Sequence, residues 1–172
     1  MLKLATTNNL DEIMKIINDA KLYLKNQNLK QWNQDDGYPT KNDLLKDINN
    51  QTCYIYLEND EIIGTMSIIF TPDENYEEIK GNWLTNNTYA SIHRIAIKNT
   101  HHNKKIGVNM LLEAEKIVLN NNVSSIKIDT HNLNKPMTKT ILNAGYTYCG
   151  IITLKRSNTD NLRDAYEKML TE

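Results

Sequence analysis

The stretch from Tyr89 to Leu119 changes its hydrophobic period once, and this change restricts what the chain can fold into. Residues up to Ile97 alternate between two faces, which predicts a largely buried β-strand. From Ile106 onward the apolar residues recur with the spacing of an amphipathic helix. The polar segment between the two predicts a turn, so we expect a strand, a turn and a helix in that order.

The two faces of this strand carry different side chains. Ser91, His93, Ile95 and Ile97 fall on one face, and Ile92, Arg94 and Ala96 fall on the other. The assignment depends on unbroken alternation, because a slip of one residue would exchange the faces of His93 and Arg94.

The turn has the character of an anion site. A turn that leads into a helix N-terminus presents backbone N–H groups and the positive end of the helix dipole, and both suit a phosphate or pyrophosphate. Lys104 and Lys105 add positive charge, and Gly107 follows them. The spacing matches neither a P-loop nor a dinucleotide fingerprint. A plain strand-turn-helix unit with a solvated basic loop is the alternative.

The segment IAIKNTHHNKKIG resembles the acyl-CoA-binding segment of the GNAT superfamily of acetyl-CoA-dependent N-acetyltransferases, whose loop pattern is Gln/Arg-x-x-Gly-x-Gly/Ala. Aligned without gaps, His102 takes the Gln/Arg position, Lys105 the first Gly and Gly107 the Gly/Ala, so only Gly107 matches strictly. Other segments also resemble the family: QWNQDDGYP, the hairpin ending in IIGTMSI, the run from Asn134 to Tyr146, and the C-terminal LRDAYEKML.

The resemblance implies a fold for the whole chain. We expect one acetyltransferase-like domain over residues 1–172, of the α/β (α+β) class, with element order βααβββαβαββ. The central sheet is mixed and mostly antiparallel, with helices on both faces and splayed central strands. The expected strands are 2–6, 52–57, 62–70, 91–97, 124–130, 146–152 and 162–170, and the expected helices begin near Asn9, Thr40, Ile106 and Asn134.

Composition excludes several function classes. A net charge of −1 over 172 residues gives no general attraction to nucleic acid or to a membrane surface. The N-terminal residues lack the apolar run of a signal peptide, and no stretch is long enough to span a bilayer, so we expect a cytoplasmic protein. Cys53 and Cys149 are then free thiols. The protein is expected to be a monomer or a homodimer.

The resemblance implies acetyl-CoA as co-substrate. The loop and first helical turn would bind its pyrophosphate through His102, Asn103, Lys104, Lys105, Ile106, Gly107 and Val108. Backbone N–H groups of Ile95, Ala96 and Ile97 would donate to the thioester carbonyl as it gains charge. Asn134, in the segment that resembles a second family signature, is also assigned to the cofactor.

The acceptor is expected to be an amine of a small molecule or a protein. Trp32 and Tyr38 lie in an otherwise polar loop, and they suit a pocket wall that combines aromatic surface with a few polar groups. Tyr89 is a third candidate for the acceptor site. The alternative for Trp32 and Tyr38 is that they pin the loop to the core.

An amine must lose its proton before it attacks a thioester. An alkylamine pKa near 10.4 makes deprotonation at pH 7.4 cost about 4 kcal/mol. His93 is the first candidate for the base and His131 the second, and each has the alternative of a satisfied structural histidine. Tyr89, Asp35 and Asp36 are weaker choices.

The thiolate can depart without a strong general acid. Because a thiol has a pKa near 8.5, departure in the unprotonated form at pH 7.4 costs only about 1.5 kcal/mol. Many enzymes of the family place a tyrosine on the last helix as general acid, and Ile141 stands at that position here. Tyr148 can substitute, whereas Tyr146 is better placed to pack in the core. His101 and His102 lack a third ligand, so no metal is expected. The departure at Ile141 also favours an alternative: a non-catalytic acyl-CoA-binding module.

Overall fold

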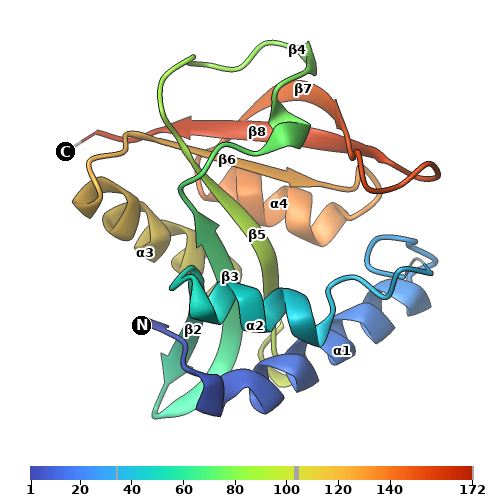
Figure 1. The fold of residues 1–172 in the computed structure, drawn as a ribbon, viewed down its shortest axis with the longest axis vertical. Helices are drawn as coiled ribbons and strands as arrows, with labels where there is room; N and C mark the ends of the chain where they lie inside the picture. The colour runs from blue at the N-terminus through green and yellow to red at the C-terminus, as the bar shows by residue number, and fades with distance from the viewer. Residues whose placement is uncertain (34, 103–104, 172) are drawn as a thin grey trace. The chain divides into compact units, whose positions relative to one another are not determined.

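The computed structural model describes residues 1–33, 35–102 and 105–171. The α-helices are α1 (Leu10–Asn26), α2 (Lys41–Asn49), α3 (Ile106–Asn120) and α4 (Lys135–Asn143). The strands are β1 (Leu2–Leu4), β2 (Cys53–Glu58), β3 (Glu61–Ile69), β4 (Ile79–Gly81), β5 (Ala90–Ile97), β6 (Ser125–Thr130), β7 (Thr147–Thr153) and β8 (Leu162–Met169), and short 3-10 turns cover Thr7–Asn9, Glu74–Tyr76 and Asn99–His101 (Figure 1).

Within these residues eight strands form one sheet in the order β1-β2-β3-β5-β6-β8-β7-β4. The pairs β1–β2, β2–β3, β4–β7, β6–β8 and β7–β8 are antiparallel, and β5–β6 is parallel. The parallel pair follows from the long α3 crossover between its strands, which an antiparallel hairpin does not need. The predicted fold class, a mixed and mostly antiparallel sheet with helices, is confirmed.

The chain divides into two compact units. Unit 1 comprises Met1–Ile68 and His93–Met110, and unit 2 comprises Ile69–Ile92 and Leu111–Glu172. In unit 1, α1 and α2 pack on the sheet through one apolar cluster. Its buried members are Ala5, Leu10, Ile13, Ile16, Ile17, Leu44, Ile48, Cys53, Ile55, Ile62 and Ala96.

Capping explains where the helices of unit 1 begin. The Thr40 hydroxyl accepts from the N–H of Asp43, and the Asp43 carboxylate accepts from the N–H of Thr40, which is a reciprocal capping box for α2. α1 begins after Asn9, as expected, but the side chain of Asn9 does not cap it. Asn9 instead pairs with Thr6 across the preceding 3-10 turn.

β5 departs from the predicted alternation at one residue. Arg94 has φ 53, a left-handed conformation inside a strand. Such a residue is typical of a bulge, which adds an unpaired residue to the ladder and re-aims a side chain. Ala90, Ser91 and Ile92 are all buried in succession, as expected for a largely buried strand, and the assignment of the two faces beyond Ile92 stays a prediction. The pairing with β6 covers only the part from Ala90 to Ile92, opposite Ile126–Ile128.

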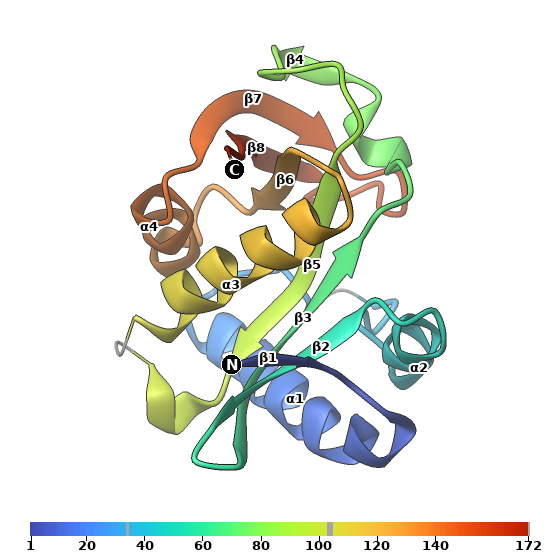
Figure 2. The same ribbon diagram turned by 90° about the vertical axis from the view of Figure 1, so that its left-hand side faces the viewer.

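Unit 2 is built around the β7–β8 hairpin, with β6 on one side and β4 on the other (Figure 2). The sequence indicated only a loop where β4 lies. Gly81 of β4 faces Gly150 of β7, and both have left-handed φ values, of 142 and 143. A Cβ at Gly81 would lie 2.1 Å from the Cys149 carbonyl oxygen, and one at Gly150 would lie 2.3 Å from that of Lys80. The two backbones approach closely because neither residue has a side chain.

A buried charged pair lies in the centre of unit 2. Lys127 of β6 stands directly opposite Glu167 of β8 in the sheet, and they are 4% and 0% exposed. The Lys127 ammonium lies 4.2 Å from the ring centre of Trp83 and 4.0 Å from that of Tyr89. Glu167 accepts from the Ser125 hydroxyl at 2.6 Å. The contacts of Lys127 hold the segment before β5 against the sheet.

The two cysteines and the last helix show which side chains are buried. Cys53 and Cys149 are free thiols, as expected, and both are buried. Ile141 of α4 is buried, whereas its neighbour Leu142 is 50% exposed. In the described ranges, no helix has both the length and the apolar character needed to cross a bilayer.

Candidate functional site

The segment that carries the predicted cofactor site lies in unit 1 from His93 to Met110. It consists of the second half of β5, the 3-10 turn Asn99–His101, and the start of α3. Two hydrogen bonds fix this turn, from the Lys98 N–H to the Ile63 carbonyl and from the His101 N–H to the Lys98 carbonyl, both 2.8 Å long. Asn103 and Lys104, both predicted to bind the cofactor, lie outside the described residues.

The N-terminus of α3 has the features of an anion-binding turn. The N–H of Asn109 donates to the Lys105 carbonyl at 3.0 Å, so the N–H groups of Ile106, Gly107 and Val108 come before the first intrahelical bond. Lys105 is exposed, has φ 58, and precedes the first helical residue. The first turn holds no acidic residue. These donors and the charge of Lys105 suit an anionic group.

His102, the residue at the family's Gln/Arg position, is held against the turn. Its Nε2 lies 3.2 Å from the Ile97 carbonyl oxygen, and because a carbonyl can only accept, Nε2 is the donor. The ring also meets Tyr23 of α1 edge-on, with 5.1 Å between centres. His102 therefore joins the end of β5 to α1. Its neighbour His101 lies 3.7 Å from a Glu58 carboxylate oxygen instead.

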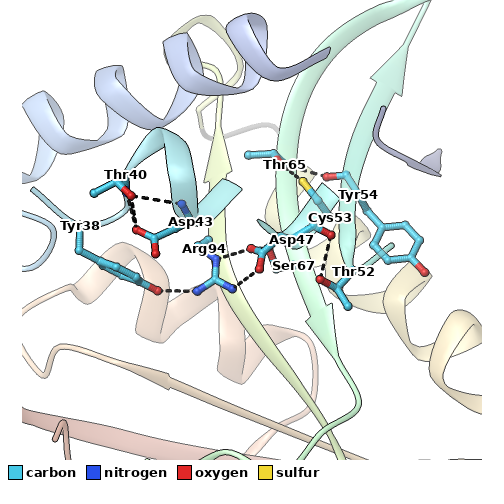
Figure 3. Close-up of polar contacts among 10 residues, drawn as sticks. All are labelled: Tyr38, Thr40, Asp43, Asp47, Thr52, Cys53, Tyr54, Thr65, Ser67 and Arg94. Atoms are coloured by element: carbon cyan, nitrogen blue, oxygen red, sulfur yellow. Dashed lines mark hydrogen bonds and ion pairs between the residues drawn. The ribbon is translucent and has the colours of Figure 1, made fainter. Parts of the chain in front are cut away.

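Arg94 is the centre of a polar cluster that reaches three other elements of unit 1 (Figure 3). Its Nε and Nη2 donate to the two carboxylate oxygens of Asp47 in α2, at 2.6 and 2.9 Å. Its Nη1 donates to the Tyr38 hydroxyl at 2.7 Å. The Ser67 hydroxyl of β3 donates to Asp47 at 2.6 Å. We call these four residues the Arg94 cluster.

The Arg94 cluster is charged and largely withdrawn from water. The side chains of Arg94 and Asp47 are 11% and 8% exposed. Burial lowers the pKa of the Arg94 guanidinium, but Tyr38 and Asp47 more than offset it, so that the pKa lies above its usual value. Arg94 is therefore a permanent cation, and its fork matches the carboxylate in a bidentate pair.

The aromatic residues predicted to line the acceptor site have different surroundings. Trp32 has φ 60 and packs against the apolar cluster of unit 1, which is the packing that the alternative interpretation describes. Tyr38 is half-buried and contacts Arg94 through its hydroxyl. The ammonium of Lys21 fixes the loop between them, donating to the carbonyls of Gly37 and Pro39 at 2.6 and 2.7 Å.

The two candidate bases lie in different units. His93 is half-buried in unit 1, directly before the left-handed residue of β5. His131, in unit 2, has a partner for each ring nitrogen. Its Nδ1 accepts from the N–H of Leu133 at 3.1 Å, and its Nε2 therefore carries the proton that faces Asp160 Oδ1 at 2.8 Å. This geometry occupies the lone pair that a general base would need.

The remaining predicted residues lie in unit 2. Asn134 is buried and caps α4, its side-chain oxygen accepting from the N–H of Met137 at 3.3 Å. The Tyr89 hydroxyl accepts from the N–H of Asp73 at 2.9 Å. Tyr148 is 51% exposed, and burial together with Asp164 raises the pKa of its hydroxyl, which makes it a weaker acid. Ile141 is fully buried and takes part in packing.

Sequence reasoning missed the Arg94 cluster. A signal for it exists in the sequence: Asp47 lies on the inward face of α2 beside Leu44 and Ile48, and Arg94 interrupts an apolar strand. Opposite charges at two inward positions predict a buried pair. No group of three or more His, Cys, Asp or Glu among the described residues has an arrangement that could hold a metal ion.

Several solved structures are similar to this one. An acetyltransferase of the GNAT family from Streptococcus agalactiae is 29% identical, with a TM-score of 0.90, and the match covers 100% of this chain and 96% of that chain. A GNAT acetyltransferase from Listeria monocytogenes is 17% identical, with a TM-score of 0.74 and coverage of 99% and 94%.

The aminoglycoside acetyltransferase AAC(6')-Ib, in complex with ribostamycin and coenzyme A, is 18% identical, with a TM-score of 0.69 and coverage of 98% and 92%. Like the Listeria match, this one shows a shared fold alone. No curated protein matches the sequence. The sequence model of the acetyltransferase (GNAT) family matches residues 11–146. Since that match covers well over half of the chain, the protein belongs to the acetyltransferase (GNAT) family.

Proposed function

We propose that the protein transfers the acetyl group of acetyl-CoA to an amine of a small molecule or a protein. Family membership supports acyl transfer in general, and AAC(6')-Ib has been solved with coenzyme A and an aminoglycoside. The observation that carries the proposal is the segment from β5 to α3. It joins a strand with a left-handed residue to a helix N-terminus that has a basic flank and no acid in its first turn.

Acetyl-CoA, when bound, supplies an activated acetyl thioester. The N–H groups of Ile106, Gly107 and Val108 would bind its pyrophosphate, with Lys105 and His102 beside them. The pairing of β5 with β6 covers Ala90 to Ile92, before the left-handed Arg94. We assign the backbone N–H groups from Ile95 to Ile97, just after Arg94, to the thioester carbonyl.

For proton transfer we propose His93 as the base that receives the amine proton. It is half-buried, and it lies on the same strand as the proposed carbonyl donors. His131 is less suited to this role, because both ring nitrogens are engaged. Tyr148 is kept as a proton donor to the departing thiolate, although its raised pKa weakens it. The low cost of releasing a thiolate means that no strong acid is required.

We assign Tyr38 to the acceptor side, and the roles of Trp32 and Tyr89 stay predictions from the sequence. Tyr38 presents an aromatic ring on a loop that Lys21 and Arg94 hold in place. A single domain, a cytoplasmic location, and a monomeric or homodimeric state stay predictions from the sequence.

Cofactor binding is tested by thermal stability with and without acetyl-CoA. A ligand at 100 times its Kd stabilises a protein by about 2.7 kcal/mol, and a chain of this size shifts its Tm by about 2–4 °C per kcal/mol. We therefore expect an increase of roughly 5–10 °C. Lys105→Glu should reduce the shift. Lys116→Glu, the same change at an exposed position later in α3, should not. No shift at millimolar acetyl-CoA refutes the proposal.

Transfer itself is tested by thiol release from acetyl-CoA in the presence of a panel of polyamines, amino acids, aminoglycosides and peptides. His93→Gln should lower kcat and leave acetyl-CoA affinity unchanged. The fully buried Ile141 at the usual acid position supports a second candidate function, a non-catalytic acyl-CoA-binding module. Binding of acetyl-CoA without release of thiol by any amine favours that function.

A further inference from the structure

The Arg94 cluster connects two parts of the proposed site that are distant in sequence. One is β5, whose residues after Arg94 would contact the thioester. The other is the loop between α1 and α2, which carries Tyr38. Arg94 Nη1 contacts Tyr38 at 2.7 Å, and the other two guanidinium donors contact Asp47. One guanidinium is therefore shared between the acceptor loop and a helix of the core (Figure 3).

The backbone conformation of Arg94 requires stabilising contacts such as these hydrogen bonds. A left-handed conformation is unfavourable for any residue with a Cβ, and it persists where surrounding contacts determine it. Arg94 donates three hydrogen bonds to Asp47 of α2 and Tyr38 of the loop, and Ser67 of β3 donates a further one to Asp47. These hydrogen bonds fix the position of the guanidinium, and they thereby fix the direction in which the side chain of Arg94 points from the strand.

The conformation of Arg94 affects the residues that follow it in β5. We expect a change at residue 94 to turn the peptide planes of Ile95 to Ile97, because the left-handed φ of Arg94 sets the direction in which the chain continues. Catalytic donors must be held close to their productive geometry, and a displacement of one ångström has a large effect.

We propose that Arg94 is a positioning residue for acetyl-CoA, and that its bond to Tyr38 couples the acceptor loop to the cofactor strand. This inference rests on the proposed function and adds two things to it. The orientation of the backbone donors in β5 depends on a buried side chain that does not itself contact the thioester. The loop that carries Tyr38 responds to the cofactor through that side chain.

The first test measures acetyl-CoA affinity by calorimetry, and the free energy of unfolding in urea, for the same set of variants. Arg94→Lys keeps the charge but loses the fork that reaches Asp47 and Tyr38 together. Tyr38→Phe removes only the hydroxyl. Tyr54→Phe is the matched control, since Tyr54 is a half-buried tyrosine of β2 whose ring points away from the cluster (Figure 3).

We expect Arg94→Lys to weaken acetyl-CoA binding by about twofold to thirtyfold, the range of coupling through such networks. Tyr54→Phe should bind as the wild type does. A purely structural role predicts lower stability with an unchanged Kd. An Arg94→Lys variant that loses stability but keeps its Kd within twofold would therefore overturn the proposal. Wild type that binds no acetyl-CoA would instead refute the proposed function, and this inference with it.

Hydrogen exchange gives a second measurement that needs only a small substitution. Acetyl-CoA should slow exchange in residues 94–98 and also in residues 35–40 of the wild type. In Tyr38→Phe the protection of 94–98 should remain, while that of 35–40 should be lost. Equal protection of residues 35–40 in both proteins would show that the loop responds without the Arg94 contact, and would overturn the coupling.

Discussion

Asp47→Asn tests the energetic weight of the Arg94 cluster. Asp47 accepts hydrogen bonds from Ser67 and from two nitrogens of Arg94. The amide of asparagine keeps the shape of the side chain but replaces one acceptor by a donor, which then faces another donor. The guanidinium loses its counter-charge in a place where its side chain is only 11% exposed.

The cost follows from this burial. Removing one partner of a buried ion pair leaves an uncompensated charge and costs roughly 3–5 kcal/mol. For a chain of 172 residues the Tm should fall by about 2–4 °C per kcal/mol, or by about 6–20 °C in total. An exposed pair behaves differently, because water and salt screen it, and it contributes less than about 1 kcal/mol.

Asp11→Asn supplies the matched control. Asp11 lies 3.1 Å from the Lys41 ammonium, and the side chains of Asp11 and Lys41 are 85% and 62% exposed. Urea denaturation followed by circular dichroism should show a large loss of unfolding free energy for Asp47→Asn and a small one for Asp11→Asn, with similar m-values. A loss below about 1 kcal/mol for Asp47→Asn would show that the pair behaves as a surface pair, and would refute the reasoning.

Three further predictions concern other parts of the molecule. Gly64→Ala should destabilise by about 1–3 kcal/mol, because the new Cβ would lie 2.8 Å from the sulfur of the buried Met110, and Met110→Val in the same chain should recover part of the loss. Burial raises the pKa of the Cys53 thiol to about 11, so about 0.1% is thiolate at pH 8, and a disulfide reagent that labels it rapidly without denaturant would contradict this. Burial lowers the pKa of Lys127 despite the opposing effect of Glu167, so the charged form of Lys127 destabilises the folded state. The unfolding free energy of the wild type, measured relative to that of Lys127→Met, should therefore increase as the pH rises toward 10.5. A decrease would mean that the attraction of Glu167 dominates.

The elements were predictable because their periodicities are strong and their ends carry clear signals. The change of period between β5 and α3, the Thr40 cap of α2, and Asn134 at the start of α4 each appear in the structure where the sequence indicates them. β4 was missed because it is three residues long and pairs through Gly81, which carries no strand preference.

The site was harder to predict, because its arrangement depends on the backbone conformation of one residue, Arg94. Alternation assumes a regular ladder, and the left-handed Arg94 departs from regular strand geometry. No local property of arginine indicates such a conformation. It depends on Asp47, Ser67 and Tyr38, which are brought to it only by the folded chain. The pattern could therefore locate the strand but not the direction of its side chains.

The facing glycines of β4 and β7 determine how the molecule is protected from self-association. β4 occupies the outer edge of β7, and an uncovered edge strand is a template for pairing with another chain. Gly81 and Gly150 leave no room for a methyl group on either side, so an alanine at either position would displace β4 and uncover β7. The expected effect of substitutions at Gly81 or Gly150 is therefore aggregation during expression, even if the molecules that do fold kept their activity.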